Sequence, residues 1–212
     1  MLVLIACESS GVSRRLWREA GHDAWSCDLL PAADGSPFHI TGNVLDVLGN
    51  GWDLMIAHPP CTYLCSSGMH WTTRGLRDPQ LTEDALVFVR MLMDAPIPHI
   101  AVENPVGAIG SRIRPASCWV QPFEHGDDAS KRTGLWLKNL PPLVPTTIVA
   151  PRLVNGKPRW ANQTDSGQNR LGPSPDRWQV RSKTYDGIAM AMVAQWSRHI
   201  ESKLDEVSHE QN

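Results

Sequence analysis

The sequence predicts an α/β protein built on a parallel sheet that helices cover on both faces. Two features indicate this fold class: short, almost wholly apolar runs recur through the first half of the chain, and segments with helical periodicity lie between them. The chain has 212 residues, which is enough for one domain with a full core, or for one domain with a small lobe.

Four segments are expected to be strands because they are apolar and end at polar or turn-forming residues: 1–7 (MLVLIAC), 22–30 (HDAWSCDLL), 52–58 (WDLMIAH) and 99–104 (HIAVEN). A helix is predicted over 12–20, where Val12, Leu16 and Ala20 share one face and Gly21 follows. Alternating strands and helices are typical of a parallel sheet.

A second long helix is expected to begin at a Thr82 cap and to end at Pro96. Beyond residue 105 the chain becomes rich in Pro, Gly, Asn, Gln and Arg, and only TGLWL (133–137) and TTIVA (146–150) resemble strands. Helical periodicity returns over 184–200.

Charge divides the chain into the segments that we expect to be its functional parts. Residues 1–111, the expected cofactor-binding and catalytic core, carry 6 Lys/Arg against 12 Asp/Glu, whereas residues 112–183 carry 12 against 5. Residues 184–200 are expected to return as a helix to the core, and 201–212 to form a polar tail that frays. A basic segment on an acidic body is typical of a surface that binds a polyanion, although a solvated basic loop is the alternative.

Composition argues against a membrane-spanning protein and against a secreted one, and it favours the cytoplasm. No apolar run approaches the ~20 residues that span a bilayer, so no membrane partner is expected. The five cysteines follow no regular spacing and no secretion signal precedes them, so we expect reduced thiols in a cytoplasm. The sequence does not indicate the oligomeric state.

The turn after the first predicted strand is a candidate ligand site. Its residues, Ala6, Cys7, Glu8, Ser9, Ser10 and Gly11 (ACESSG), lie where ligands bind open α/β sheets, outside the carboxyl ends of the strands. Asp28, which Leu29 follows, ends the second strand, where a carboxylate commonly binds ribose hydroxyls. The glycine spacing of a dinucleotide site is absent, so a nucleoside-type cofactor fits better than a pyrophosphate.

Cys61 has three possible roles, because it follows a buried strand and two prolines in AHPPCTYLCSSG. It is a metal ligand in a set formed by His58, Cys61, Cys65 and His70, or it is inert core, or it is a nucleophile. The spacing matches no common zinc site, so no metal is expected. Cys7, Cys27 and Cys118 are interpreted as inert, and Cys65 is left open.

The nucleophile is favoured because a carboxyl group is expected close to Cys61. Glu103, in VENP, ends another strand at the same edge of the sheet. A thiolate paired with a carboxylic acid suits addition to an electron-poor ring, in which sulfur attacks carbon while the acid protonates a ring nitrogen. The polar stretch that follows, CSSGMHWTTRG, is expected to be a mobile loop.

These motifs resemble those of the DNA cytosine carbon-5 methyltransferases. The shared pattern is a strand, Pro-Pro-Cys and, after the next helix and strand, Glu-Asn; ACESSG, Asp28 and GNV at 42–44 fall where that family binds S-adenosylmethionine. SKRTGLWLKNLP and RSKTYDGIAMAMVAQW are similar to segments of the small phage and prophage members. The resemblance covers most of 1–145 and 163–197, and implies a Rossmann-like methyltransferase sheet in the cytoplasm of the host.

The resemblance also implies a role for each candidate residue. Cys61 would attack carbon 6 of cytosine, Glu103 would protonate nitrogen 3, and Arg132 would steady the carbonyl oxygen of the base. The base has to be flipped out or already unpaired. The cofactor would be held by Ala6, Cys7, Glu8, Ser9, Ser10, Gly11, Asp28, Leu29, Asn43, Val44, His58 and Pro60, and the DNA by Asn104, Ser66, His70 and Trp71. Independently of the resemblance, the charge of the basic segment and its KPRW and DRW motifs predict that Arg159 and Arg177 bind DNA phosphates.

The sequence departs from the family in ways that keep alternatives open. His58 stands in place of a glycine, Asn43 in place of an aspartate, and there is no separate target-recognition domain. The alternatives are a catalytically idle DNA-binding protein, a methyltransferase for free nucleotide or RNA, and a cofactor that delivers a larger group. An amino-group methyltransferase is disfavoured, because Cys61 occupies the position of its stacking aromatic residue. Single-stranded and duplex DNA are not distinguished, and neither is the target sequence.

Overall fold

The computed structural model describes residues 1–172, 174 and 184–210, with the side chains of the last helix described up to residue 203. The chain divides into two compact units. The first comprises Met1–Trp119 with Thr133–Pro142, and the second Val120–Arg132 with Leu143–Asn212.

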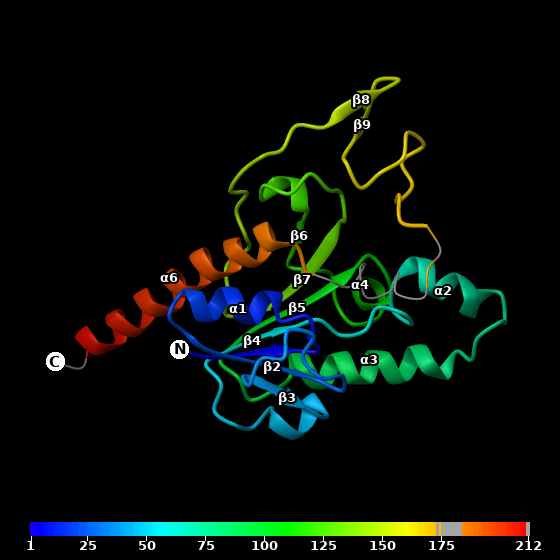
Figure 1. The fold of residues 1–212 in the computed structure, drawn as a ribbon. Helices are drawn as coiled ribbons and strands as arrows, with labels where there is room; N and C mark the ends of the chain where they lie inside the picture. The colour runs from blue at the N-terminus through cyan, green and yellow to red at the C-terminus, as the bar shows by residue number, and fades with distance from the viewer. Residues whose placement is uncertain (173, 175–183, 211–212) are drawn as a thin grey trace. The chain divides into compact units, whose positions relative to one another are not determined.

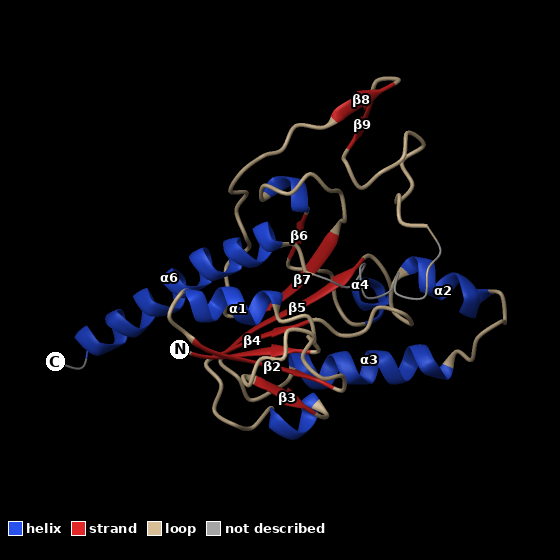
Figure 2. Cartoon of the chain, in the orientation of Figure 1, coloured by secondary structure: helices blue, strands red, loops and turns tan. Residues whose placement is uncertain are grey.

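The first unit contains most of a seven-stranded sheet in the order β3-β2-β1-β4-β5-β7-β6 (Figures 1 and 2). Strands β3, β2, β1, β4 and β5 are parallel, and β7 runs antiparallel to β5. The strands are β1 (Leu2–Ala6), β2 (Asp23–Asp28), β3 (His39–Thr41), β4 (Leu54–Ala57), β5 (His99–Pro105), β6 (Cys118–Val120) and β7 (Thr133–Lys138).

This topology confirms the predicted fold class. The chain begins in the middle of the sheet, runs outward through β2 and β3, and returns to the other side of β1 with β4. The reversal between β1 and β4 is the topological switch point at which open α/β sheets bind ligands. The order, with an antiparallel β7, is that of the Rossmann-like sheet of S-adenosylmethionine-dependent methyltransferases.

The central strands are buried on both faces, which explains why they read as continuous apolar runs. Val3, Leu4, Ile5 and Ala6 of β1 have no exposed surface, and neither has any residue of β4. Side chains from β1, β4 and β5 form one core with α3 (Gln80–Met93), which contributes Leu86, Val89 and Leu92. The first turn leads into α1 (Val12–Glu19), whose Trp17 is wholly buried.

Three expectations about local structure were wrong. The polar stretch after Cys61 is helical, since α2 spans Ser66–Thr73. Thr82 lies inside α3 rather than capping it, and its hydroxyl donates to the carbonyl of Tyr63 at 3.1 Å. TTIVA is not a strand: Thr147 alone forms an isolated bridge, with His125, and Ile148 is 66% exposed.

The remaining short elements of the first unit connect the strands. They are η1 (Val44–Val47), which follows β3, and α4 (Ala108–Arg112), which follows β5. In the second unit η2 (Pro122–Glu124) carries a capping box made with Gln121. A hairpin of β8 (Arg152–Val154) and β9 (Lys157–Arg159) was not foreseen from the sequence.

The last helix of the second unit, α6, spans Asp186–Glu210 and so continues beyond the expected end at residue 200. Its buried side chains Ile188, Met192, Trp196 and Ile200 recur every four residues, as the periodicity predicted. None of the described helices combines the length and the hydropathy that a membrane span requires.

Candidate active site

The carboxyl ends of β1, β4 and β5 bring three sequence motifs to one edge of the sheet. Parallel pairing places Ala6 of β1 beside Ala57 of β4, and Ala57 beside Val102 of β5. The next residues are the first turn, the His-Pro-Pro-Cys segment and Glu-Asn-Pro, respectively. The backbone amide of His58 donates to the carbonyl of Ala6 at 2.9 Å, which ties the first two motifs together.

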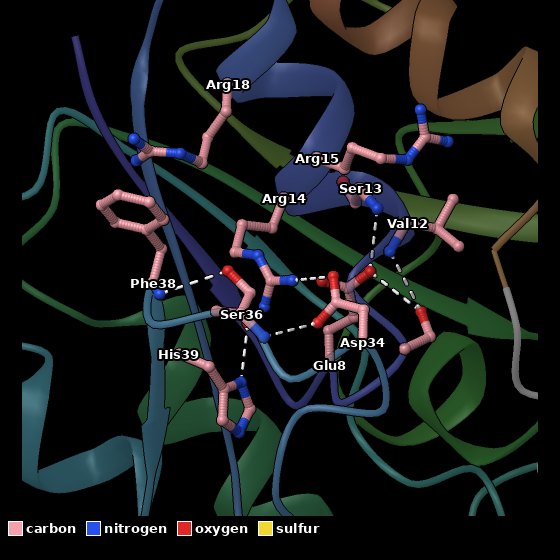
Figure 3. Close-up of polar contacts among 12 residues, drawn as sticks. Glu8, Val12, Ser13, Arg14, Arg15, Arg18, Asp34, Ser36, Phe38 and His39 are labelled. Carbon is pink, nitrogen blue, oxygen red and sulfur yellow. Dashed lines mark hydrogen bonds and ion pairs between the residues drawn. The ribbon is translucent and has the colours of Figure 1, made fainter.

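The first turn is built around a buried carboxylate. Glu8 is 5% exposed, and its Oε1 accepts hydrogen bonds from the backbone amide of Ser13 at 2.8 Å and from the hydroxyl of Ser10 at 3.1 Å (Figure 3). Cys7, which precedes it, has a positive φ of 59°. The other carboxylate oxygen, Oε2, is buried and has no hydrogen-bond partner. An orphaned charged acceptor is costly unless a ligand or water satisfies it.

An internal ion pair fills the space beside Gly11. Arg14 is 1% exposed and pairs with Asp34, and it also donates to Ser26 at 2.7 Å (Figure 3). A Cβ on Gly11 would lie 2.5 Å from Arg14 and from Asp34, and φ at Gly11 is +76°. The positive φ therefore favours glycine here, and a larger residue would also have to displace the ends of these two side chains.

The predicted ribose and adenine residues lie at the ends of β2 and β3. Asp28 accepts from the backbone amide of Leu30 at 2.9 Å, and Leu29 beside it is 76% exposed. Asn43 caps η1 by accepting from the amide of Leu45 at 3.1 Å. Val44 is 3% exposed, so its side chain offers almost no surface to a ligand.

Direct contacts join the Pro-Pro-Cys segment to Glu-Asn. The Nδ1 atom of His58 lies 2.5 Å from Oε2 of Glu103, and the two side chains are only 11% and 14% exposed. Asn104 is buried, and its Nδ2 donates to the carbonyl of Pro59 at 2.9 Å. Sequence reasoning placed both motifs at one edge but missed these two contacts, because nothing in the sequence pairs His58 with Glu103.

The turn that follows Cys61 is held by backbone contacts. Leu64 and Cys65 donate through their amides to the carbonyl of Cys61 at 3.0 and 2.9 Å. Cys65 then forms a bridge with Gly107, where a Cβ would lie 1.9 Å from the carbonyl oxygen of Leu64. The turn that presents Cys61 is therefore fitted against the backbone that follows Glu-Asn.

Two of the predicted substrate residues line a cavity of about 440 Å³ beside this turn. Ser66 and His70, from one face of α2, lie on one side of it, and Val106 and Ser111 contribute to the other. Ser66 donates to the carbonyl of Val106 through both its amide and its hydroxyl. Trp71 does not line this cavity; it is 49% exposed.

The cysteines differ in their environments. Burial, with the nearby Asp28 carboxylate, raises the pKa of Cys7 to about 12 and that of Cys27 to about 11. Cys61 and Cys65 are partly exposed. Across the part of the chain that the structure describes, no three His, Cys, Asp or Glu side chains are grouped so as to hold a metal ion, so the alternative zinc set around Cys61 is not formed.

The structure gives different information on each of the three predicted basic residues. Arg132 is an exposed residue of the second unit, immediately before β7, and Arg177 lies outside the described residues. Arg159, in β9, donates to the carbonyls of Asp165 at 3.1 Å and Pro158 at 2.7 Å. Its neighbour Trp160 stacks on Phe123 with ring centroids 4.1 Å apart. Arg159 and Trp160 thus have a structural role within their unit.

The site and sheet together define a Rossmann-like fold of the methyltransferase type, with a cysteine and a glutamate at its ligand-binding edge. No protein-family model matches the chain, and no curated protein matches it. Among solved structures, a similar one comes from E. coli and is described as a candidate DNA modification methyltransferase encoded within a prophage. Its sequence is 16% identical, the TM-score is 0.45, and the match covers 65% of this chain and 46% of the other. This chain thus spans less than half of that protein.

Proposed function

We propose that this protein transfers a methyl group from S-adenosylmethionine to carbon 5 of cytosine in DNA, through a covalent adduct on Cys61. The observation that carries the proposal is that the His-Pro-Pro-Cys segment and Glu-Asn contact each other at the carboxyl edge of the sheet, beside its topological switch point. His58 contacts Glu103, and Asn104 holds Pro59, so that the turn bearing the cysteine is fixed against the strand bearing the acid.

The two side chains support nucleophilic addition with acid assistance. The Cys61 sulfur forms a bond to carbon 6 of cytosine, and the electrons of the carbon 5–carbon 6 double bond move through the ring to nitrogen 3. Nitrogen 3 takes the proton of the Glu103 carboxylic acid. Carbon 5 is then electron-rich enough to accept a methyl group. Loss of the carbon 5 proton to solvent and expulsion of the Cys61 thiolate restore the double bond, and the proton on nitrogen 3 returns to the Glu103 carboxylate.

The first turn and its neighbours fit the cofactor. The unpartnered, buried Oε2 of Glu8 is an acceptor for a cationic group, such as an ammonium. The carboxylate of Asp28 ends β2 where ribose hydroxyls bind, and the exposed Leu29 offers an apolar surface to a purine. When bound here, S-adenosylmethionine supplies an electrophilic methyl group.

The substrate assignment follows from the chemistry and from the surface near the cysteine. Carbon 6 of cytosine cannot be reached inside a duplex stack, so the base must be unpaired or flipped. Exposed His70 and Trp71 on α2 are proposed to contact DNA, and Trp71 offers a flat ring to the gap left by a flipped base. Arg132 keeps its proposed role at the carbonyl oxygen of the base.

The test is covalent trapping. Oligonucleotides with 5-fluorocytosine should form a stable adduct in the presence of S-adenosylmethionine, because fluorine cannot leave carbon 5 as a proton. Intact-mass analysis should find one adduct per chain, and peptide mapping should place it on Cys61. Cys61→Ala should give none, whereas Cys65→Ala should still react.

Parallel substrates separate the proposal from its alternatives. Single-stranded DNA, duplex DNA, RNA and free deoxycytidine nucleotides are compared in the same assay, with nucleoside mass spectrometry for 5-methylcytosine. Methylation of RNA or free nucleotide alone would replace DNA as the substrate. Binding of DNA without adduct or methyl transfer would identify an idle DNA-binding protein, and an adduct on Cys65 would overturn the role of Cys61.

A further inference from the structure

We infer that His58 is a positioning residue for the acid: it holds Oε2 of Glu103 and so directs the other carboxyl oxygen, Oε1, to nitrogen 3 of the base. This inference rests on the proposed function and adds a residue and an atomic assignment to it. The sequence placed His58 among the cofactor-binding residues, which stays a prediction; in the structure its Nδ1 contacts the carboxyl group of Glu103.

The backbone explains why the two side chains meet. Ala57 pairs with Val102 in the register of β4 and β5, so His58 and Glu103 are the next residues along adjacent parallel strands. The amide of His58 is fixed to the carbonyl of Ala6, and Glu103 pairs with Leu135 of the antiparallel β7 on its other side. Both backbones are held within the sheet, so the 2.5 Å separation of Nδ1 and Oε2 is set by the fold.

The contact determines which oxygen can act as the acid. An Nδ1–H that donates to Oε2 leaves the acidic proton of Glu103 on Oε1. When nitrogen 3 takes that proton, Glu103 becomes a carboxylate, and Nδ1–H then donates to a charged acceptor. Hydrogen bonds to charged groups are stronger than those between neutral groups, so His58 stabilises the product of proton transfer more than the starting acid.

Low exposure of the pair increases this differential effect. With the two side chains 11% and 14% exposed, little water is available to solvate the new carboxylate. A fixed donor therefore replaces solvent at the atom where charge develops, which is the arrangement that lowers a barrier. A glycine at position 58, as in the resembling family, has no side chain with which to do this.

The test compares His58→Asn with His58→Ala in the full chain. The amide nitrogen of asparagine is attached to Cγ, as Nδ1 is in histidine, so Asn can keep the donor although it lacks the ring. The rate of adduct formation with 5-fluorocytosine DNA should fall about 10- to 100-fold in His58→Ala, as expected for loss of a hydrogen bond to a charged group. His58→Asn should recover most of that loss.

A matched control lies at the start of β5, the strand that carries Glu103 near its other end. His99 also uses Nδ1 in a hydrogen bond, to the carbonyl of Asp53 at 3.0 Å, but it is remote from the carboxyl ends of the strands. His99→Ala and His99→Asn should form the adduct at the wild-type rate. Thermal melts of all four variants should show whether any loss of rate follows loss of folding.

A second measurement does not depend on activity. Nitrogen-15 NMR of the histidine side chains in the wild type should show a proton on Nδ1 of His58, and Glu103→Gln should shift that resonance. A ring protonated only on Nε2, or equal adduct rates in the wild type and His58→Ala, would overturn the inference. A wild type that forms no adduct but shows the Nδ1 proton would overturn the proposed function alone.

Discussion

Asn104 donates through Nδ2 to the carbonyl oxygen of Pro59 at 2.9 Å, so the residue after Glu103 holds the chain two residues before Cys61. Asn104 is 1% exposed, and this hydrogen bond gives it a role in positioning the turn; its expected contact with DNA stays a prediction. In the proposed mechanism, the Glu-Asn motif would therefore contribute two functions from adjacent positions: Glu103 as the acid, and the buried amide of Asn104 as the group that fixes the turn leading to Cys61.

Asn104→Ala should lower both stability and the rate of adduct formation. Loss of the donor leaves a buried carbonyl unsatisfied, so the free energy of unfolding should fall by about 1–3 kcal/mol. The adduct rate should fall at least tenfold even at temperatures where the variant is folded, because small displacements of a reacting group are costly. Denaturant melts and trapping kinetics measure the two effects.

The control for this prediction is Asn139, which makes the same kind of contact elsewhere. Its Nδ2 donates to the carbonyl of Pro98 at 2.8 Å in an exposed turn with a positive φ. Asn139→Asp removes the donor in a residue type that tolerates this conformation. Unchanged adduct kinetics are expected; a loss as large as that of Asn104→Ala would mean that the effect is one of general stability.

Gly107 and Gly110 provide a pair of substitutions that differ in the space open to an added Cβ. A Cβ on Gly107 would lie 1.9 Å from the carbonyl oxygen of Leu64, whereas one on Gly110 would meet nothing within 4 Å. Gly107→Ala should therefore displace the turn that presents Cys61 and reduce adduct formation strongly. Gly110→Ala, within α4, should preserve the rate and stabilise the protein by up to about 1 kcal/mol. Equal rates in the two variants would show that the fit of this turn is unimportant.

Alkylation should distinguish Cys61 from Cys7 and Cys27 as pH is raised. The thiolate is the reactive form, and the pKa values of Cys7 and Cys27, raised to about 12 and about 11, keep both thiols protonated at neutral and mildly alkaline pH. Iodoacetamide should therefore label the partly exposed Cys61 before Cys7 and Cys27, which should react only as the pH approaches those values. Peptide mass spectrometry at stepwise increasing pH measures the order; early labelling of Cys7 would contradict it.

The sheet could be predicted from the sequence because its central strands are buried on both faces. β1 and β4 read as uninterrupted apolar runs, and the rule that ligands bind at strand carboxyl ends then placed Cys61 and Glu103 at one edge. The contact of His58 with Glu103 could not be predicted. It depends on the exact register of β4 against β5, and a shift of one residue would separate two side chains that are more than forty positions apart in the chain.

Elements without a buried face were predicted poorly. α2 buries none of its residues, so it has no apolar periodicity, and its Ser, Thr and Gly content indicated a loop. TTIVA has the β-branched residues of a strand but no partner strand, and its Ile148 is largely exposed. In both cases composition alone gave the wrong structure, because the segment has no buried face that would make its sequence pattern informative.

For Arg159 the contacts in the structure lead to a prediction opposite to the phosphate binding that charge alone suggested. The basic segment suggested that Arg159 and Arg177 bind phosphate, but the guanidinium of Arg159 donates to the carbonyls of Asp165 and Pro158. Arg152 pairs with the Asp165 carboxylate at 2.6 Å, so two arginines hold the same short loop.

Arg159→Ala should therefore melt earlier than the wild type and bind DNA with an unchanged salt dependence. Each lost hydrogen bond should cost about 0.5–1.5 kcal/mol. A contact with duplex phosphate would instead make the slope of log affinity against log salt shallower by about 0.9. Arg198→Ala, an exposed position on α6, is the control for removing one positive charge. Both quantities are measured on each variant, and a shallower slope in Arg159→Ala than in Arg198→Ala, with no change in melting, would restore Arg159 as a phosphate-binding residue.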